Sequence, residues 1–157
     1  MISLTAPLNA DLLLAGKVQI ACNGGADLVY WTGPDDQRPA AITRIREIAS
    51  QVPGVLSTHA TTDEWLRLGP EAGDVVAYCA QGWRFSDPNP LTSNPIPGNH
   101  GHPATRAIPF FISGGHPRVP QRKASSALAR TVDVAPTVAS FFRAGKPRRG
   151  WDGRARI

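Results

Sequence analysis

The sequence predicts an α/β fold in which a mixed sheet carries flanking helices. Three observations support this class: two short β-rich runs around an Asn-Gly-Gly turn, an amphipathic segment at helical spacing, and a valine-rich run of strand length. The 157 residues, 41% of them hydrophobic, have the length and apolar content of one ordinary domain, residues 1–157. No apolar run approaches the roughly 18–20 residues that cross a bilayer, so we expect a soluble protein without membrane contact.

The first elements along the chain are a hairpin and a helix. Residues 17–22 and 27–31 are rich in β-forming side chains, and the Asn-Gly-Gly between them is a turn signal that joins antiparallel strands. Apolar residues then recur at helical spacing over 39–52, and the Pro-Gly pair at 53–54 ends the run. We therefore expect a hairpin followed by an amphipathic helix.

The next segment predicts two strands and a short helix. Val55 and Leu56 begin a strand, and residues 62–68 have the polar start and apolar positions of a short helix. Residues 74–80, rich in valine and tyrosine, predict a buried strand. Residues 82–85 either pair with this strand or extend it.

Residues 86–107 predict a long loop, because repeated prolines prevent a continuous helix or central strand. Loops of this length inside a domain are often functional. The apolar run 108–112 predicts a strand and 113–117 a turn. Residues 131–142 predict a helix, with Pro136 near its start, where a missing N–H costs little.

Charge and cysteine content bear on the partners and the cellular location of the protein. The net charge of +5 comes mainly from arginine, and the tail 144–157 is strongly basic. A basic tail can hold nucleic acid through phosphate contacts, but only Trp151 interleaves with these charges, so a solvated tail is favoured. Cys22 and Cys79 lack metal-binding spacing, which favours buried free thiols. Without a basic segment ahead of the apolar residues 12–15, the N-terminus does not resemble a secretory signal, and we expect a cytoplasmic protein.

Three motifs carry a resemblance to a known family. Residues 97–102, Pro-Gly-Asn-His-Gly-His, precede the apolar run that ends at Gly114 and Gly115. Downstream, Asp133 begins a D-x-x-P-T pattern and residues 152–154 read Asp-Gly-Arg, while residues 73–77 form a weaker Gly-Asp-apolar match. In this order, over roughly the last ninety residues, the motifs resemble the phosphodiesterase and nucleotide pyrophosphatase branch of the alkaline phosphatase superfamily.

The resemblance implies the C-terminal part of an α/β sandwich, incomplete because strands and helices of the parent sheet are missing. It implies that His100 corresponds to a zinc ligand, with flanking glycines that let the backbone approach a metal centre. In intact relatives, two metal ions would support in-line attack on a phosphoric ester. A zinc ion needs about three or four protein ligands, however, and His100 is only one, so an exposed loop histidine without metal stays an equal alternative.

The family's nucleophilic Thr or Ser and its other Asp and His ligands are not recognisable in this sequence. We therefore expect an inactive fragment of a hydrolase: a gene remnant, a piece beginning at an internal Met, or one half of a split enzyme. Its partner would be the missing N-terminal half or a second copy. The alternative is a binding module whose basic tail engages an anionic partner such as RNA.

The remaining polar residues have simpler interpretations. Asp35 and Asp36 suggest a solvated turn that leads into the helix, and His59 a surface or capping position. His102 and His116 could join His100 in an improvised three-histidine site, which we regard as the weaker hypothesis. Asp133 and Thr137 are explained by capping and the helix dipole.

Overall fold

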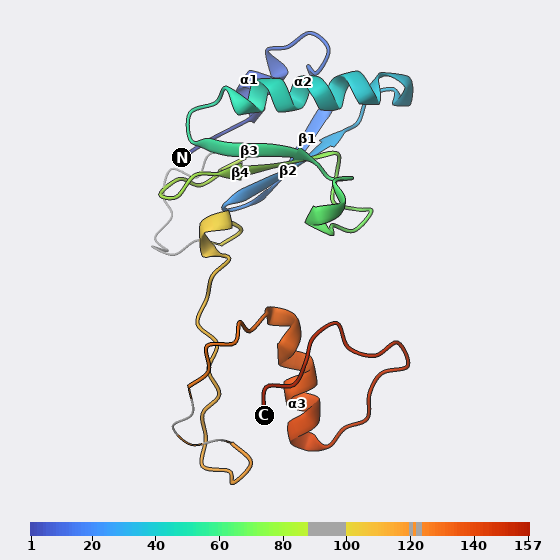
Figure 1. Ribbon diagram of the computed structural model, residues 1–157. Coiled ribbons are helices and arrows are strands. Elements are labelled where there is room, and N and C mark those ends of the chain that lie inside the picture. The colour runs from blue at the N-terminus through green and yellow to red at the C-terminus, as the bar shows by residue number, and fades with distance from the viewer. Residues whose placement is uncertain (88–99, 120, 122–123) are drawn as a thin grey trace. The chain divides into compact units, whose positions relative to one another are not determined.

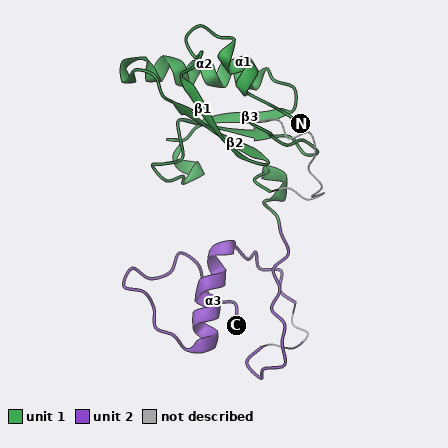
Figure 2. Ribbon diagram, turned by 180° about the vertical axis from the view of Figure 1, so that it is seen from behind, with its two compact units in different colours: residues 1–107 green, residues 108–157 purple. Residues whose placement is uncertain are grey.

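The structure is a computed structural model that describes residues 1–87, 100–119, 121 and 124–157. The chain, expected as one domain over 1–157, divides into two compact units, residues 1–107 and 108–157 (Figure 2). Each unit is described by itself. Much of the long loop predicted over 86–107 lies outside the described residues.

Unit 1 is built on a four-stranded sheet with the order β1-β2-β4-β3. β1 (Val18–Asn23) and β2 (Ala26–Trp31) form the predicted hairpin, and β4 (Val75–Cys79) lies between β2 and β3 (Val55–Ala60). The sheet was expected to be mixed, but each pairing in it is antiparallel. The reason is that β2 and β3, which run in the same direction, are separated by β4 rather than paired with each other.

Two helices cover one face of this sheet (Figure 1). α1 spans Thr5–Asn9, and α2 spans Arg38–Ser50, close to the predicted 39–52. α2 buries Ala41, Ile45 and Ala49, which recur every four residues and so share one face of the helix. The spacing that predicted this helix is therefore the spacing that packs it.

The core of unit 1 lies between these helices and the sheet. It joins residues from the N-terminal segment, α2 and alternate positions of the strands, where side chains of one face recur every second residue. Its fully buried members include Leu4, Leu8, Leu14, Val29, Ile45, Val75 and Ala77. The N-terminal segment is thus part of the core, which the sequence patterns did not predict.

Several predicted elements differ in extent. β3 continues beyond Val55 and Leu56 to Ala60, and the short helix predicted over 62–68 is one turn of 3-10 helix, Glu64–Leu66. That turn ends at Arg67, whose φ of 51° is left-handed and stops a helix. Residues 82–85 neither extend β4 nor pair with it; Phe85 instead forms a parallel bridge with Ile2.

Unit 2 confirms the predicted helix over 131–142. A 3-10 turn, Thr131–Asp133, leads into α3, Val134–Phe142. The predicted strand over 108–112 is wrong: these residues have no strand structure. A strand needs a paired backbone, and the described part of unit 2 offers none.

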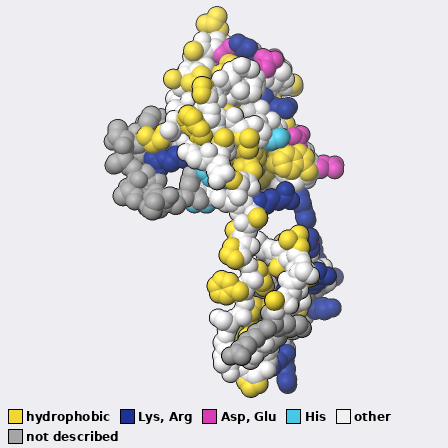
Figure 3. Space-filling view, turned by 60° about the vertical axis from the view of Figure 1, so that its left-hand side comes forward, with side chains coloured by type: hydrophobic (Ala, Val, Ile, Leu, Met, Phe, Trp, Pro, Cys, Tyr) yellow, Lys and Arg dark blue, Asp and Glu magenta, His cyan; other side chains and the backbone are white. Residues whose placement is uncertain are grey.

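The apolar side chains of the 108–112 segment instead line an open groove against α3. Hydrophobic side chains are visible at several places on the surface of the protein (Figure 3). The most exposed groove residues are Ile108, Phe111 and Phe142. Over the described ranges, no helix combines the length and the apolar character that a membrane crossing requires.

Two leucines of the N-terminal segment test this packing. Leu8 is 0% exposed and Leu12 is 96% exposed. Leu8→Ala should lower the free energy of unfolding by about 2–5 kcal/mol, because it removes buried methyl groups and leaves a cavity. Leu12→Ala should change it by less than about 0.5 kcal/mol. Urea unfolding followed by circular dichroism measures both, and equal effects of the two variants would contradict this core.

Candidate functional site

Three segments converge on the turn between β1 and β2. The N–H of Phe85 donates to the carbonyl of Gly24 at 2.7 Å, and the N–H of Cys79 donates to that of Gly25 at 3.0 Å. Gly25 in turn donates its N–H to the carbonyl of His100 at 2.7 Å. We call this place the turn site: the turn Asn23–Ala26 with Cys79, residues 85–87 and residues 100–102.

His100, the expected zinc ligand, is held at the turn site through its backbone, and the residue is exposed. The approach is close: a Cβ at Gly25 would lie 2.5 Å from the backbone nitrogen of His102, and one at Gly101 would lie 2.6 Å from the carbonyl oxygen of Asn23. Both distances are far below contact, so glycine is required on both sides. The glycine beside His100 therefore lets the loop pack on the hairpin turn.

The other two histidines do not join His100. His102 is buried, with Nδ1 3.6 Å from the Sγ of Cys79. His116 belongs to unit 2, where its ring packs edge-on against Phe141 at 4.9 Å. Neither unit contains all three side chains, so the three-histidine hypothesis gains no support.

The donor set does not fit a zinc site. Among the described residues, no three His, Cys, Asp or Glu side chains come together as metal ligands. Zinc binds about three or four such groups, and His100 offers one imidazole nitrogen. The chemistry expected from the resemblance therefore cannot be derived from the described residues of this chain.

The most unusual side chain near the turn site is Asp27, on β2. It is fully buried, and neither of its carboxyl oxygens has a hydrogen-bond partner among the described residues. Burial first, and then the neighbouring Asp87 carboxylate, raise the pKa of Asp27 to about 9. Asp27 is therefore neutral at neutral pH, and it carries its proton inside the fold.

Asp87 has the opposite character. It accepts hydrogen bonds from the backbone N–H of Leu4 at 2.8 Å and of Thr5 at 2.9 Å, and from the hydroxyls of Ser3 and Thr5. Burial opposes ionisation, but the neighbouring Asp27 and these donors lower the pKa of Asp87. An ionised carboxylate thus ties the N-terminal segment to the turn site.

The two thiols are not activated nucleophiles. Burial raises the pKa of the Cys79 thiol to about 11, and burial also raises that of Cys22. A thiolate is the reactive form, so both are inert thiols at neutral pH. Both cysteines are free, as expected, and Cys79 is buried. Cys22 was also expected to be buried, but it is exposed on β1 and only partly shielded from water.

In unit 2, the D-x-x-P-T and Asp-Gly-Arg motifs meet around Asp133. Its buried carboxylate accepts the backbone N–H groups of Arg130 at 2.9 Å and Arg154 at 3.0 Å, and it pairs with the Arg156 guanidinium. These donors, Arg154 first, lower the pKa of Asp133. We call this arrangement the Asp133 knot.

Two neighbours complete the knot. Thr137 accepts the N–H of Arg156 at 3.1 Å and donates to the carbonyl of Asp133 at 2.6 Å. A Cβ at Gly153 would lie 2.1 Å from the carbonyl oxygen of Val132, which explains glycine in the second motif. Asp133 closes a capping box at the 3-10 turn but makes no side-chain cap on α3, and Thr137 lies inside α3. Their contacts therefore go beyond the expected capping, and they anchor part of the basic tail that was expected to be solvated.

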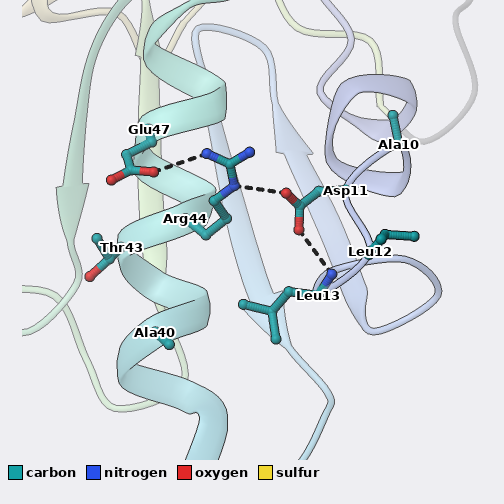
Figure 4. Close-up of a pocket in the computed structure, with 8 residues that line it drawn as sticks. All are labelled: Ala10, Asp11, Leu12, Leu13, Ala40, Thr43, Arg44 and Glu47. Carbon is teal, nitrogen blue, oxygen red and sulfur yellow. Dashed lines mark hydrogen bonds and ion pairs between the residues drawn. The ribbon is translucent and has the colours of Figure 1, made fainter.

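Ion pairs of Arg44 connect the two sides of a shallow pocket between the N-terminal segment and α2 (Figure 4). Arg44 donates to Asp11 at 2.7 Å and to Glu47 at 3.1 Å. On the preceding turn, Arg38 bonds Asp35 at 2.8 Å, so the expected solvated turn is partly paired, while Asp36 is exposed. Exposed ion pairs of this kind contribute little stability.

Sequence reasoning missed Asp27 and Asp87 as a pair. A signal for Asp27 was present, because a carboxylate within the apolar run Ala26–Trp31 contradicts a buried strand. Asp87 had no comparable signal, since it stands in a proline-rich loop sequence. Their proximity depends on the N-terminal segment and the turn site.

Comparison of the chain with protein-family models, with curated proteins and with solved structures finds no match. The resemblance to the alkaline phosphatase superfamily therefore rests on the motifs themselves.

The buried Asp27 predicts a pH-dependent stability. The folded protein keeps a proton that the unfolded chain, with a carboxyl pKa near 3.8, releases. The stability that the folded state gains from keeping this proton is fully present below pH 3.8, and it is lost as the pH rises through about 9. Asp27→Asn keeps the shape and cannot ionise, so its stability relative to wild type should increase between about pH 5 and about pH 8.5.

Urea unfolding of both proteins at the two pH values measures this difference. The control is Asp36→Asn, at an exposed carboxylate, which should leave the pH dependence of wild type unchanged. If Asp27→Asn loses as much stability with rising pH as wild type does, the buried carboxyl is not protonated in the folded state.

Proposed function

We propose that this chain is the C-terminal part of a metal-dependent phosphoric ester hydrolase of the alkaline phosphatase superfamily, from its phosphodiesterase and nucleotide pyrophosphatase branch. The observation that carries the proposal is the Asp133 knot. Two motifs that stand about twenty residues apart, and that occur in this order in the family, bond to one another here through Asp133, Arg154 and Thr137. Contact between the two motifs around Asp133 thus gives a physical reason for both to be present in one chain.

The turn site supports the same proposal. The Gly-Asn-His-Gly motif places His100 on the surface with its backbone fixed against Gly25. A fixed backbone at an exposed residue suits a loop that contributes one ligand to a site completed elsewhere. The remaining ligands and the nucleophile would come from a separate polypeptide, and the substrate would be a phosphoric ester.

The nucleic-acid alternative has less support. In the basic tail, the Arg156 guanidinium turns inward to Asp133 and to the carbonyl of Leu128, so this charge serves packing. Phosphate contacts require cations that face the solvent, and in the tail these are the exposed Lys146, Arg148, Arg149 and Arg154.

The isolated chain should not hydrolyse aryl phosphate monoesters or diesters, with or without added zinc. The reason is that one exposed histidine cannot hold a catalytic zinc, which needs about three protein ligands. Steady-state assays of the purified protein measure this. Turnover that requires zinc, disappears in His100→Ala and survives in His116→Ala would contradict the prediction, since His116 is a histidine outside the motif.

A complementing polypeptide should restore the site. The first candidate is any chain encoded next to this one that carries a Thr or Ser nucleophile and an Asp-His motif. Zinc should tighten its association with this chain, because binding to the assembled form alone stabilises that form. His100→Ala should abolish this zinc effect and ester hydrolysis, whereas His116→Ala should preserve both.

Titration calorimetry with and without zinc, together with an ester assay of the mixture, tests the complementation. An affinity between the two chains that is the same with and without zinc, or activity that survives the loss of His100, would show that this histidine is not a metal ligand.

A further inference from the structure

A serine, a histidine and an aspartate lie in line at the edge of the sheet in unit 1. The Oγ of Ser57 is 3.0 Å from the Nε2 of His59, and the Nδ1 of His59 is 3.9 Å from an oxygen of Asp63. Ser57 and His59 stand two residues apart on β3, so their side chains share one face of the sheet. Asp63 follows β3 directly, in the connection to β4.

This group is on the face of the sheet away from α2. His59 pairs with Val76 and Ser57 with Tyr78, while the core residues Ala77 and Cys79 alternate with these positions and point toward the helices. In Figure 1 the connection that carries Asp63 lies on the side of the sheet opposite α2. On that side the 3-10 turn Glu64–Leu66 places Trp65 against His59, and the side chains of His59 and Asp63 stay partly exposed.

Aromatic rings fix the imidazole. Trp65 packs edge-on against His59 with ring centroids 4.9 Å apart, and Tyr78 lies at 6.1 Å. The side chain of His59 is 25% exposed and that of Asp63 is 38% exposed. The ring is therefore held in place and still accessible to a small molecule.

The arrangement has the atom order of a nucleophilic serine site. In such sites one imidazole nitrogen accepts the serine proton, and a carboxylate at the other nitrogen orients the ring and stabilises its charged form. Hydrogen bonding alone would explain a Ser57 and His59 pair, but it would not require a carboxylate on the opposite nitrogen. The Asp63 oxygen, 3.9 Å from Nδ1, lies beyond hydrogen-bond distance and acts on the ring through its charge. The three groups nevertheless have the order found in a nucleophilic serine site.

We propose that Ser57 is a nucleophile toward activated carboxylic esters, with His59 as its general base and Asp63 as a positioning residue. The Oγ of Ser57 forms a bond to the ester carbonyl carbon, its proton passes to Nε2 of His59, and the bond to the aryl oxygen breaks. The phenolate leaves and takes up that proton. Water then attacks the acyl-serine by the same route and releases the carboxylic acid.

The site is independent of the proposed phosphoric ester hydrolase. It uses no metal, its substrate carries a carboxyl rather than a phosphoryl group, and its residues belong to neither the turn site nor the Asp133 knot. Failure of one proposal therefore leaves the other unaffected.

The direct test is covalent labelling of the purified full chain with an alkyl fluorophosphonate. Ser57 displaces fluoride and forms a phosphorus–oxygen bond, and its proton leaves through His59. Intact mass and peptide mapping should find one label, at Ser57. Ser57→Ala should abolish labelling, and Ser50→Ala should label as wild type does, since the Ser50 hydroxyl donates to the backbone carbonyl of Glu47 on α2.

Variants at His59 and Asp63 separate chemistry from structure. His59→Ala should slow labelling and aryl acetate hydrolysis by about 100-fold, which is the usual size of a general-base contribution, and added imidazole should restore part of the rate. Asp63→Asn should slow both reactions, and Asp63→Glu should recover activity because it restores the carboxylate. A purely structural role predicts neither recovery.

Circular dichroism and urea unfolding establish that each variant is folded. A label spread over several serines, no label at Ser57 in folded wild-type protein, or equal rates for Ser57→Ala and Ser50→Ala would each overturn the proposal. Slow labelling of His59→Ala that imidazole does not accelerate would remove His59 as the base.

Discussion

The constraint on which unit 1 depends is the close approach of backbone to backbone at the β1–β2 turn. Gly24 and Gly25 exchange hydrogen bonds with three separate segments, and a side chain at Gly25 would collide with the backbone around His102. A two-residue turn with glycine can accept this crowding, because it presents no Cβ. The end of β4, the residues near Asp87 and the motif of His100 are all positioned by it.

Two buried aspartates show how surroundings, rather than residue type, set charge. Asp27 makes no hydrogen bond of ordinary length among the described residues and keeps its proton beside Asp87, whereas Asp133 receives two backbone N–H groups and the Arg156 guanidinium and is ionised. Desolvation acts on both carboxyls, but only the second is compensated by hydrogen bonds and charge. The ionised Asp133 therefore organises unit 2, while the neutral Asp27 is a cost that the rest of unit 1 offsets.

The apolar segment 108–112 illustrates the limit of strand propensity. Its residues favour extended structure, yet β-propensity mainly describes fit to a paired and half-buried surface. Without a neighbouring strand in the described part of unit 2, the segment stays exposed and lines an open groove together with residues of α3, among them Phe142.

The sequence by itself determined the local elements: the hairpin, α2, β4 and the helix over 131–142 follow from turn residues and from spacing, which are properties of neighbours along the chain. The sequence indicated an exposed loop position for His100 as one of two alternatives, and it indicated a capping role for Asp133 without the contacts to Arg154 and Arg156. Tertiary structure decided that β4 separates β2 from β3, that Asp27 meets Asp87, and that Ser57, His59 and Asp63 lie in line. These three features depend on contacts between segments that are distant in the sequence or that face in different directions. Burial and hydrogen bonding arise only when such segments pack together, so no pattern of adjacent residues encodes them.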